Sequence, residues 1–229
     1  MEKVDTGSFM DKYMTPIAVL VGALIIAGAF AFGRGEAGLT GQQGTEPTVA
    51  VNIADVKENT GPYIGDKNAP TTMAVWYDYQ CGHCKNYDGT TLKELKASHV
   101  DTGKLRILLK DFQFFPGSEE VAVFGRAMWE AYPDQHYAWF SGVMALTVDG
   151  QLTVAQVKQV AAGIPGVDAE QVAQLATQKR DAYLAAVKAD REEGGTFGVT
   201  GTPATIVGKQ MLGGAQPYAV VSAAVDEAK

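Results

Sequence analysis

Residues 72 to 85 of the chain read TMAVWYDYQCGHCK. The first eight of them are rich in β-branched and aromatic side chains, which predicts a buried strand over 72–79. Two cysteines, Cys81 and Cys84, follow at once. Helical spacing then continues over 85–100, at Tyr87, Leu92, Leu95 and His99. The cysteines therefore belong to a junction between a strand and the N-terminus of a helix.

The cysteine pair is too close in sequence to stabilise the fold. The chain has only two cysteines among 229 residues, and a disulfide between them would hardly constrain the unfolded chain. At a helix start, backbone N–H groups and the helix dipole favour the thiolate of Cys81. Cys84, one turn further on, can attack a mixed disulfide and release its substrate. The pair is suited to thiol–disulfide exchange.

Two residues separate the cysteines. Gly82 removes side-chain bulk beside Cys81, and the His83 imidazole can donate to the Cys81 thiolate or place a charge beside it. Stabilising the thiolate makes the pair more oxidising. Three other interpretations stay open, namely half of a zinc site, an inert pair of thiols, and a His83 that is only a surface residue. Zinc needs two more ligands, and the remaining histidines show no paired spacing. We therefore predict no metal and no cofactor beyond a redox-active Cys81–Cys84 disulfide.

The rest of the chain completes an α/β pattern. Helical segments are predicted from 118 to about 191, interrupted at Pro133, Gly150 and Pro165-Gly166. A last helix begins at Pro217 and ends at Glu227. The other predicted strands are 105–112, 204–207 and 210–212, the last two joined by a turn at Gly208-Lys209.

Thr202-Pro203 directly precedes one of these strands. A proline entering a strand has no N–H for the ladder, and X-Pro is the one kind of bond where a cis peptide costs little. A cis bond would expose backbone groups that can pair with an extended substrate beside the cysteines. From these residues alone, an ordinary loop proline is the simpler interpretation.

With both motifs placed, the chain from about Gly61 to Lys229 resembles the DsbA-like family of the thioredoxin superfamily. The resemblance rests on GDKNAP at 65–70, DYQCGHCK at 78–85, the helical block, and VTGTPA at 199–204. It implies a thioredoxin fold with a helical insertion at about 116–192. It also implies that Cys81 is the nucleophile, that Cys84 resolves, and that Pro203 is cis. Thr202, which precedes it, would share in substrate binding.

The chain departs from the family pattern at two places. The best-known oxidases have Pro-His between the cysteines, whereas Gly82-His83 is similar to eukaryotic protein disulfide isomerases. Those oxidases and thioredoxin also carry a buried acid six positions before the first cysteine, where this chain has Val75. The nearest carboxylate is that of Asp78, three positions before Cys81, and an ordinary surface residue is one interpretation of it. We expect a potential in the middle to oxidising part of the range of roughly −270 to −120 mV known for relatives.

The N-terminal region contains an apolar segment. Residues 16–33 read PIAVLVGALIIAGAFAFG and carry no charge, and with Met14 and Thr15 they approach the roughly 20 residues that span a bilayer. Lys3, Lys12 and Arg34 give a weak positive-inside bias. We predict a cytoplasmic N-terminus (1–13), a transmembrane anchor or uncleaved signal (14–33), a flexible linker (34–50) and an extracytoplasmic domain (51–229). A cleaved signal peptide and a buried core helix are the alternatives.

These features predict a function. The net charge of −7 and the absence of a Lys/Arg run argue against nucleic acid as a partner. We predict a single-pass protein of the cell membrane, a thiol:disulfide oxidoreductase that faces the periplasm or the outside and introduces disulfides into reduced or unfolded exported polypeptides. The resemblance implies re-oxidation by a membrane quinone-linked disulfide oxidase, DsbB-like or VKOR-like. A disulfide isomerase or reductase on the same scaffold, and a tethered chaperone or binding module, remain as alternatives.

Overall fold

A five-stranded mixed sheet forms the centre of the computed structural model, which describes residues 50–58, 61–146 and 152–228. The strand order is β1-β3-β2-β4-β5, and β2 and β3 are parallel while the other neighbours are antiparallel. The strands are β1 (Tyr63–Ile64), β2 (Thr71–Tyr77), β3 (Leu105–Asp111), β4 (Ala204–Val207) and β5 (Gln210–Gly213). All the predicted strands are confirmed, although β2 ends two residues earlier than predicted, and β1 was not predicted.

One long helical run follows β2. It begins at Gly82 and ends at Val100, and two π-helical segments interrupt it. Its parts are α2 (Gly82–Tyr87), η2 (Asp88–Leu92), α3 (Lys93–Leu95) and η3 (Lys96–Val100). The predicted helix over 85–100 is therefore confirmed, with a start directly behind Cys81.

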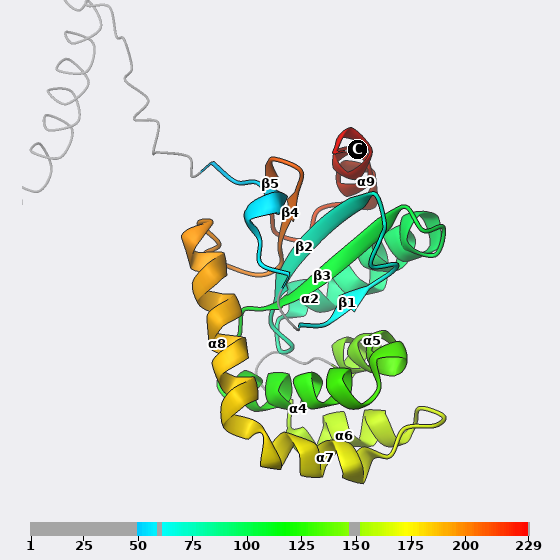
Figure 1. The fold of residues 1–229 in the computed structure, drawn as a ribbon, viewed down its shortest axis with the longest axis vertical. Coiled ribbons are helices and arrows are strands. Elements are labelled where there is room, and N and C mark those ends of the chain that lie inside the picture. The colour runs from blue at the N-terminus through cyan, green and yellow to red at the C-terminus, as the bar shows by residue number, and fades with distance from the viewer. Residues whose placement is uncertain (1–49, 59–60, 147–151, 229) are drawn as a thin grey trace, which may run out of the picture. The chain divides into compact units, whose positions relative to one another are not determined.

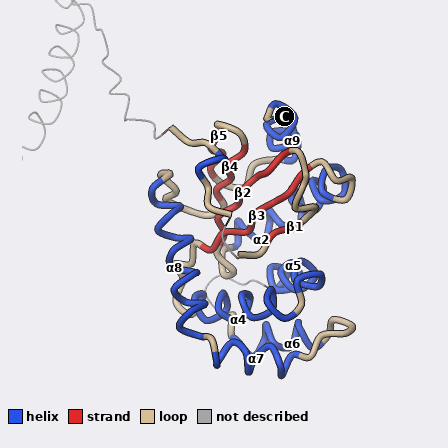
Figure 2. The backbone as a smooth tube through the Cα atoms, viewed as in Figure 1, coloured by secondary structure: helices blue, strands red, loops and turns tan. Residues whose placement is uncertain are grey.

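The predicted helical insertion lies between β3 and β4. Figure 1 shows α4 to α7 grouped on one side of the sheet, with α8 returning alongside it toward β4, and Figure 2 shows the same division by secondary structure. A last helix, α9 (Tyr218–Glu227), follows β5, and a short 3-10 helix, η1 (Ile53–Asp55), precedes β1. The insertion comprises α4 (Ser118–Ala131), η4 (Pro133–Gln135), α5 (His136–Leu146), α6 (Val154–Ala162), α7 (Ala169–Gln178) and α8 (Arg180–Thr196).

Local sequence explains how two of these helices begin. Thr153 caps α6 through a capping box with Gln156, and the Asp168 carboxylate accepts the N–H groups of Glu170 and Gln171 at the start of α7. At its other end the insertion runs past the predicted limit of 192, because α8 continues through Gly194. A Cβ at that position would lie 2.7 Å from the indole nitrogen of Trp76. This glycine allows α8 to approach β2 closely and does not end the helix.

Strand β2 is buried on both faces, as expected of a central strand. One face packs against α2 and the insertion, and the other packs against the ends of β3 and α8. The first face presents Met73, Val75 and Tyr77, and the second presents Ala74 and Trp76.

The described chain begins at the opposite end of the sheet from the cysteines. The N–H of Ile53 donates to the carbonyl of Gly208 at 2.7 Å, in the turn between β4 and β5. Val207 beside that turn pairs with Met73, near the start of β2. Cys81 follows the other end of β2, whose seven residues span roughly 20 Å.

The predictions for the N-terminal region concern residues that the structure does not describe. Residues 1–13, the proposed anchor at 14–33 and the linker up to residue 49 lie outside the described ranges. Among the helices that are described, none combines the length and the apolar character needed to cross a bilayer. These assignments therefore stay predictions.

Candidate active site

Cys81 lies where β2 passes into α2, as predicted. It is the N-cap residue of α2, with an extended backbone, and its carbonyl accepts the N–H of Lys85 at 3.1 Å. Cys84 lies in the first turn of the helix. Both side chains are thiols, and the residues are 5% and 3% exposed. The sulfurs thus meet beneath the surface, with Cys81 the more accessible of the two.

Several donors converge on the sulfur of Cys81. The Cys84 thiol hydrogen-bonds to it, and the backbone N–H groups of Cys84 and His83 also reach it. These contacts lower the pKa of Cys81 to about 5, against the opposing effect of burial. At neutral pH Cys81 is therefore a thiolate, which is the reactive form of cysteine.

The pKa of Cys84 is shifted in the opposite direction from that of Cys81. Burial raises the pKa of Cys84 well above its ordinary value, and its hydrogen bond to Cys81 adds to the effect. It therefore keeps its proton and shares it with Cys81. The geometry separates the two sulfurs into a charged outer one and a protonated inner one, which fits the predicted nucleophile and resolving cysteine.

The predicted second motif lies against the first. The Thr202–Pro203 peptide bond is cis, as the resemblance implies. Ala204, the next residue, pairs with Trp76 at the end of β2. This register brings the Thr202 carbonyl within 3.4 Å of the Cys81 sulfur, although the two residues are 121 positions apart, and the carbonyl accepts a hydrogen bond from Cys81 in its protonated, thiol form. A backbone acceptor is thus placed beside the reactive sulfur.

The residues between the cysteines contribute through the main chain. His83 is exposed and Gly82 is half-buried. The backbone N–H of His83 reaches the Cys81 sulfur, whereas its imidazole makes no hydrogen bond within the described ranges. Tuning by the imidazole stays a prediction.

Asp78 is not a surface residue, and this corrects the sequence-based expectation. It is 0% exposed. Its carboxylate accepts the N–H groups of Phe114 and Phe115 at 2.7 and 3.1 Å and the hydroxyl of Ser118 at 3.1 Å. Burial raises the pKa of Asp78, and these hydrogen bonds oppose the shift. The hydrogen-bond donors of this carboxylate come from the loop between β3 and α4 and from the start of α4, and the sequence alone does not predict that they lie near Asp78.

A buried charge cluster lies between β3, α4 and α8. Arg126 contacts Asp111 at 2.6 Å and also Asp190, and Lys110 contacts Asp190 at 2.5 Å and Glu193 at 2.8 Å. All five residues are buried. Burial raises the pKa of Asp111, and the charge of Arg126 opposes this shift. Val75 lies in the apolar core, and the buried carboxylates among the described residues are those of Asp78, Asp88 and this cluster.

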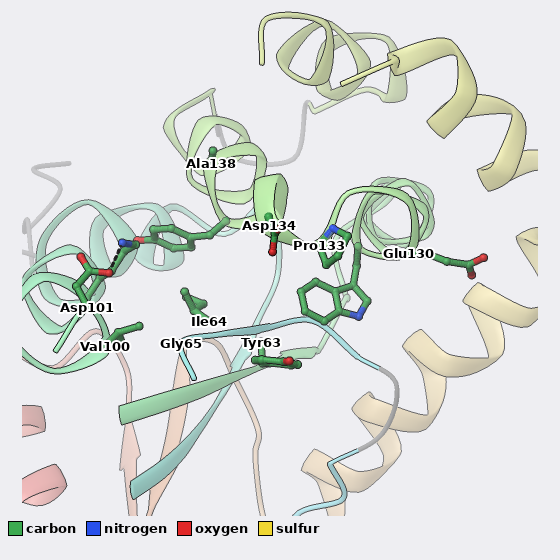
Figure 3. Close-up of a pocket in the computed structure, with 12 residues that line it drawn as sticks. Tyr63, Ile64, Gly65, Val100, Asp101, Glu130, Pro133, Asp134 and Ala138 are labelled. Atoms are coloured by element: carbon green, nitrogen blue, oxygen red, sulfur yellow. Dashed lines mark hydrogen bonds and ion pairs between the residues drawn. The ribbon is translucent and has the colours of Figure 1, made fainter. Parts of the chain in front are cut away.

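A cleft of about 810 Å³ lies away from the cysteines. Figure 3 shows its walls, formed by β1, the end of η3 and the connection between α4 and α5. Tyr63 and Trp129 lie edge to face there with ring centres 5.0 Å apart, and Lys96 pairs with Asp101 at 2.6 Å. None of the predicted site residues lines this cleft. It is separate from the redox centre.

Comparison with known proteins gives matches over most of the described chain. A family model described as thioredoxin matches residues 57–227. A probable disulfide bond formation protein D from Bacillus cereus is 24% identical over 143 residues, which cover 54% of this chain and 64% of that protein. Disulfide bond formation protein D from Bacillus subtilis is 25% identical over 77 residues, covering 33% and 35%. The chain spans less than two thirds of the length of each of these relatives.

Solved structures share the fold. BdbD from Bacillus subtilis has a TM-score of 0.69 at 17% identity, covering 79% of this chain and 97% of that one. The thiol-disulfide exchange protein α-DsbA2 from Wolbachia pipientis has a TM-score of 0.67 at 22% identity, covering 75% and 88%. DsbA from Chlamydia trachomatis has a TM-score of 0.66 at 18% identity, covering 77% and 95%. The predicted resemblance, with its helical insertion, is confirmed at the level of the fold.

Proposed function

Because the chain belongs to the thioredoxin family, we propose that it is a thiol:disulfide oxidoreductase that introduces disulfide bonds into exported polypeptides. One feature carries this proposal, the set of hydrogen bonds that stabilises the thiolate of Cys81. A dithiol whose reduced form is stabilised gives up its disulfide readily and acts as an oxidant. The names of the Bacillus relatives support the same direction.

The reaction begins from the Cys81–Cys84 disulfide. A thiolate of the substrate attacks the Cys81 sulfur, the Cys81–Cys84 bond breaks, and its electron pair leaves on Cys84, which takes up a proton. A second substrate thiolate then attacks the substrate sulfur of the mixed disulfide, and Cys81 leaves as a thiolate. The substrate has lost two electrons and gained one disulfide, and the enzyme has become a dithiol. The low pKa of Cys81 favours the last step, because a more acidic thiol leaves faster.

The Thr202 carbonyl and the cis Pro203 lie beside the position that a mixed disulfide with Cys81 would occupy. The carbonyl lies 3.4 Å from the Cys81 sulfur, so a substrate chain bonded to that sulfur passes directly beside it. Backbone N–H groups of an extended polypeptide can donate to such an acceptor without regard to sequence. This arrangement supports action on many unfolded polypeptides.

Turnover requires the dithiol to be oxidised again. We propose that a membrane-bound, quinone-linked disulfide oxidase, DsbB-like or VKOR-like, supplies a disulfide that accepts the two electrons. We also propose that residues 14–33 anchor the chain in the cell membrane, with the domain on the periplasmic or extracellular side. The uncharged run from 16 to 33 supports the anchor.

Equilibration of the full-length chain with glutathione tests the direction of the reaction. We expect a potential on the oxidising side of roughly −200 mV, and a value near the roughly −270 mV of thioredoxin would show that disulfide donation is the wrong direction. The same preparation should oxidise a reduced, unfolded protein, and Cys81→Ser should abolish this activity. Cys84→Ser should instead leave Cys81 able to form mixed disulfides with oxidised glutathione, visible as mass adducts, because no Cys84 thiol remains to attack the Cys81 sulfur and release the adduct. Efficient reshuffling of a scrambled substrate without net oxidation would favour the isomerase alternative.

A further inference from the structure

Gln80, the residue before Cys81, connects two distant segments to the redox centre. It is 0% exposed. Its side-chain amide N–H donates to the carbonyl of Pro116 at 2.9 Å, and its side-chain oxygen accepts the N–H of Leu152 at 2.9 Å. Pro116 lies between β3 and α4, and Leu152 lies between α5 and α6. A single buried amide thus joins Pro116 and Leu152 to the turn that carries the reactive sulfur.

Asp78 reinforces one of these links. Its carboxylate accepts the N–H of Gln80 at 2.7 Å, and on its other oxygen the N–H groups of Phe114 and Phe115. The Asp78 carbonyl accepts the N–H of Cys81 at 3.1 Å. The loop before α4 is therefore fixed to the cysteine turn by both side chains, while the segment before α6 is held by Gln80.

The segments held in this way expose apolar side chains. Among the described residues, five large apolar side chains are strongly exposed, and two of them, Phe114 (43%) and Val154 (39%), lie in or beside these segments. The Phe114 ring also packs against Phe115, with ring centres 4.5 Å apart. Because Gln80 directly precedes Cys81, the segments that it holds lie beside the turn that carries the sulfur, where we expect a polypeptide bonded to Cys81 to pass.

We propose that Gln80 is a positioning residue that holds the β3–α4 connection and the residues directly before α6 (152–153) against the cysteine turn, so that the apolar side chains of Phe114 and Val154 support a polypeptide in mixed disulfide with Cys81. This inference rests on the proposed function and deepens it, because it names the part of the insertion that contacts the substrate. The ligand is an extended, unfolded segment with apolar side chains beside its cysteine. A small thiol does not reach these side chains and does not need them.

Gln80→Met tests the proposal, since it preserves side-chain length and removes both hydrogen bonds. In the full-length chain we expect kcat/KM for oxidation of a reduced, unfolded protein to fall about tenfold, because a displaced binding surface is costly to reaction geometry. We expect oxidation of dithiothreitol and the glutathione equilibrium constant to stay within about twofold. Gln210→Met is the matched control, because Gln210 is exposed on β5 and its side-chain amide donates to Glu227 on α9; it should change neither rate.

Phe114→Ser gives a second test that does not depend on a buried site. We expect about a tenfold loss with the unfolded protein, corresponding to partial burial of one aromatic side chain, and no change with dithiothreitol. Met211→Ser, at a residue of similar exposure (40%) on β5, is its control. Equal losses on both substrates would overturn the proposal, and so would unchanged rates with the unfolded protein. A wild-type chain that oxidises neither substrate would instead refute the proposed function, and the inference with it.

Discussion

The sulfur of Cys81 receives its hydrogen bonds from the Cys84 thiol and from main-chain N–H groups at the start of α2. The Cys84 thiol has the largest effect on the pKa of Cys81, and the main-chain donors, which the helix fixes in place, add to it. The exposed His83 imidazole is free to contact a substrate or a partner.

The pKa of Cys81 is directly measurable. We expect the thiolate absorbance of the reduced chain to titrate near pH 5, in keeping with the pKa of about 5, and Cys81→Ser to remove this transition. Unfolded cysteine titrates near about 8.5, so between these pH values the unfolded reduced chain binds one more proton than the folded one. The free energy of unfolding of the reduced chain, relative to that of the oxidised chain, should therefore rise with pH over this window. This contribution of the Cys81 thiolate should be lost as the pH falls through 5. A midpoint near that of free cysteine would contradict the site geometry.

His136 gives a second pH dependence, which concerns stability alone. It is 1% exposed inside the insertion, and neither ring nitrogen has a hydrogen-bond partner in the described structure. Burial lowers the pKa of His136 to about 3, and the charge of Arg126 adds to the shift. The unfolded imidazole binds its proton near about 6.5, so acid favours unfolding between these two values.

The expected slope can be isolated with a single variant. We expect the free energy of unfolding of wild type, minus that of His136→Phe, to fall by up to about 1.4 kcal/mol per pH unit below pH 6. Urea unfolding at several pH values between 7 and 4 measures this difference. A difference that is constant with pH would show that His136 is protonated in the folded chain.

At the scale of elements, the buried charge cluster joins β3, α4 and α8. Arg126→Met would leave the carboxylates of Asp111 and Asp190 buried without their shared cation. We expect a loss of about 3–5 kcal/mol in the free energy of unfolding, measured by urea denaturation. Arg180→Met is the matched control, because Arg180 pairs with Glu120 at the surface, and its denaturation midpoint should hardly move. Similar losses in both variants would contradict a special role for burial.

The elements that the sequence predicts well are those with a local signal. β2 and β3 are apolar runs, and Gly208-Lys209 marks the hairpin between β4 and β5. β1 has only two residues and forms through pairing with Leu108 and Ile107 of β3. It is too short for an alternating pattern of apolar and polar residues to predict it. The helical spacing between 88 and 100 likewise predicts a helix, but it does not predict that two segments of this helix are π-helical.

The residues of the candidate site likewise fall into those that a local sequence motif predicts and those that it does not. Cys81, Cys84 and Pro203 carry motifs of their own, and the structure brings them together. Asp78 and Gln80 are identified only by their partners, and those of Gln80 lie 36 and 72 positions away in sequence. The only local signal is two polar residues around Tyr79 in an otherwise apolar approach to the motif. The roles of Asp78 and Gln80 depend on tertiary hydrogen bonds, which patterns in a single sequence do not predict.

At the scale of the whole molecule, the proposed anchor makes a prediction about topology. We expect the full-length chain to sediment with membranes, and Cys81 to react with a membrane-impermeant thiol reagent added to intact cells stripped of any outer layer. Without residues 14–33 the chain should stay inside the cell and be labelled only after lysis. Labelling of the complete chain that requires lysis would contradict the proposed orientation, and loss of an N-terminal tag would favour a cleaved signal.

The described chain begins beside Gly208, and the cysteine turn lies at the far end of β2. The two sulfurs and the start of the described chain are therefore separated by the length of β2, and an attachment made at residue 50 is remote from the sulfurs.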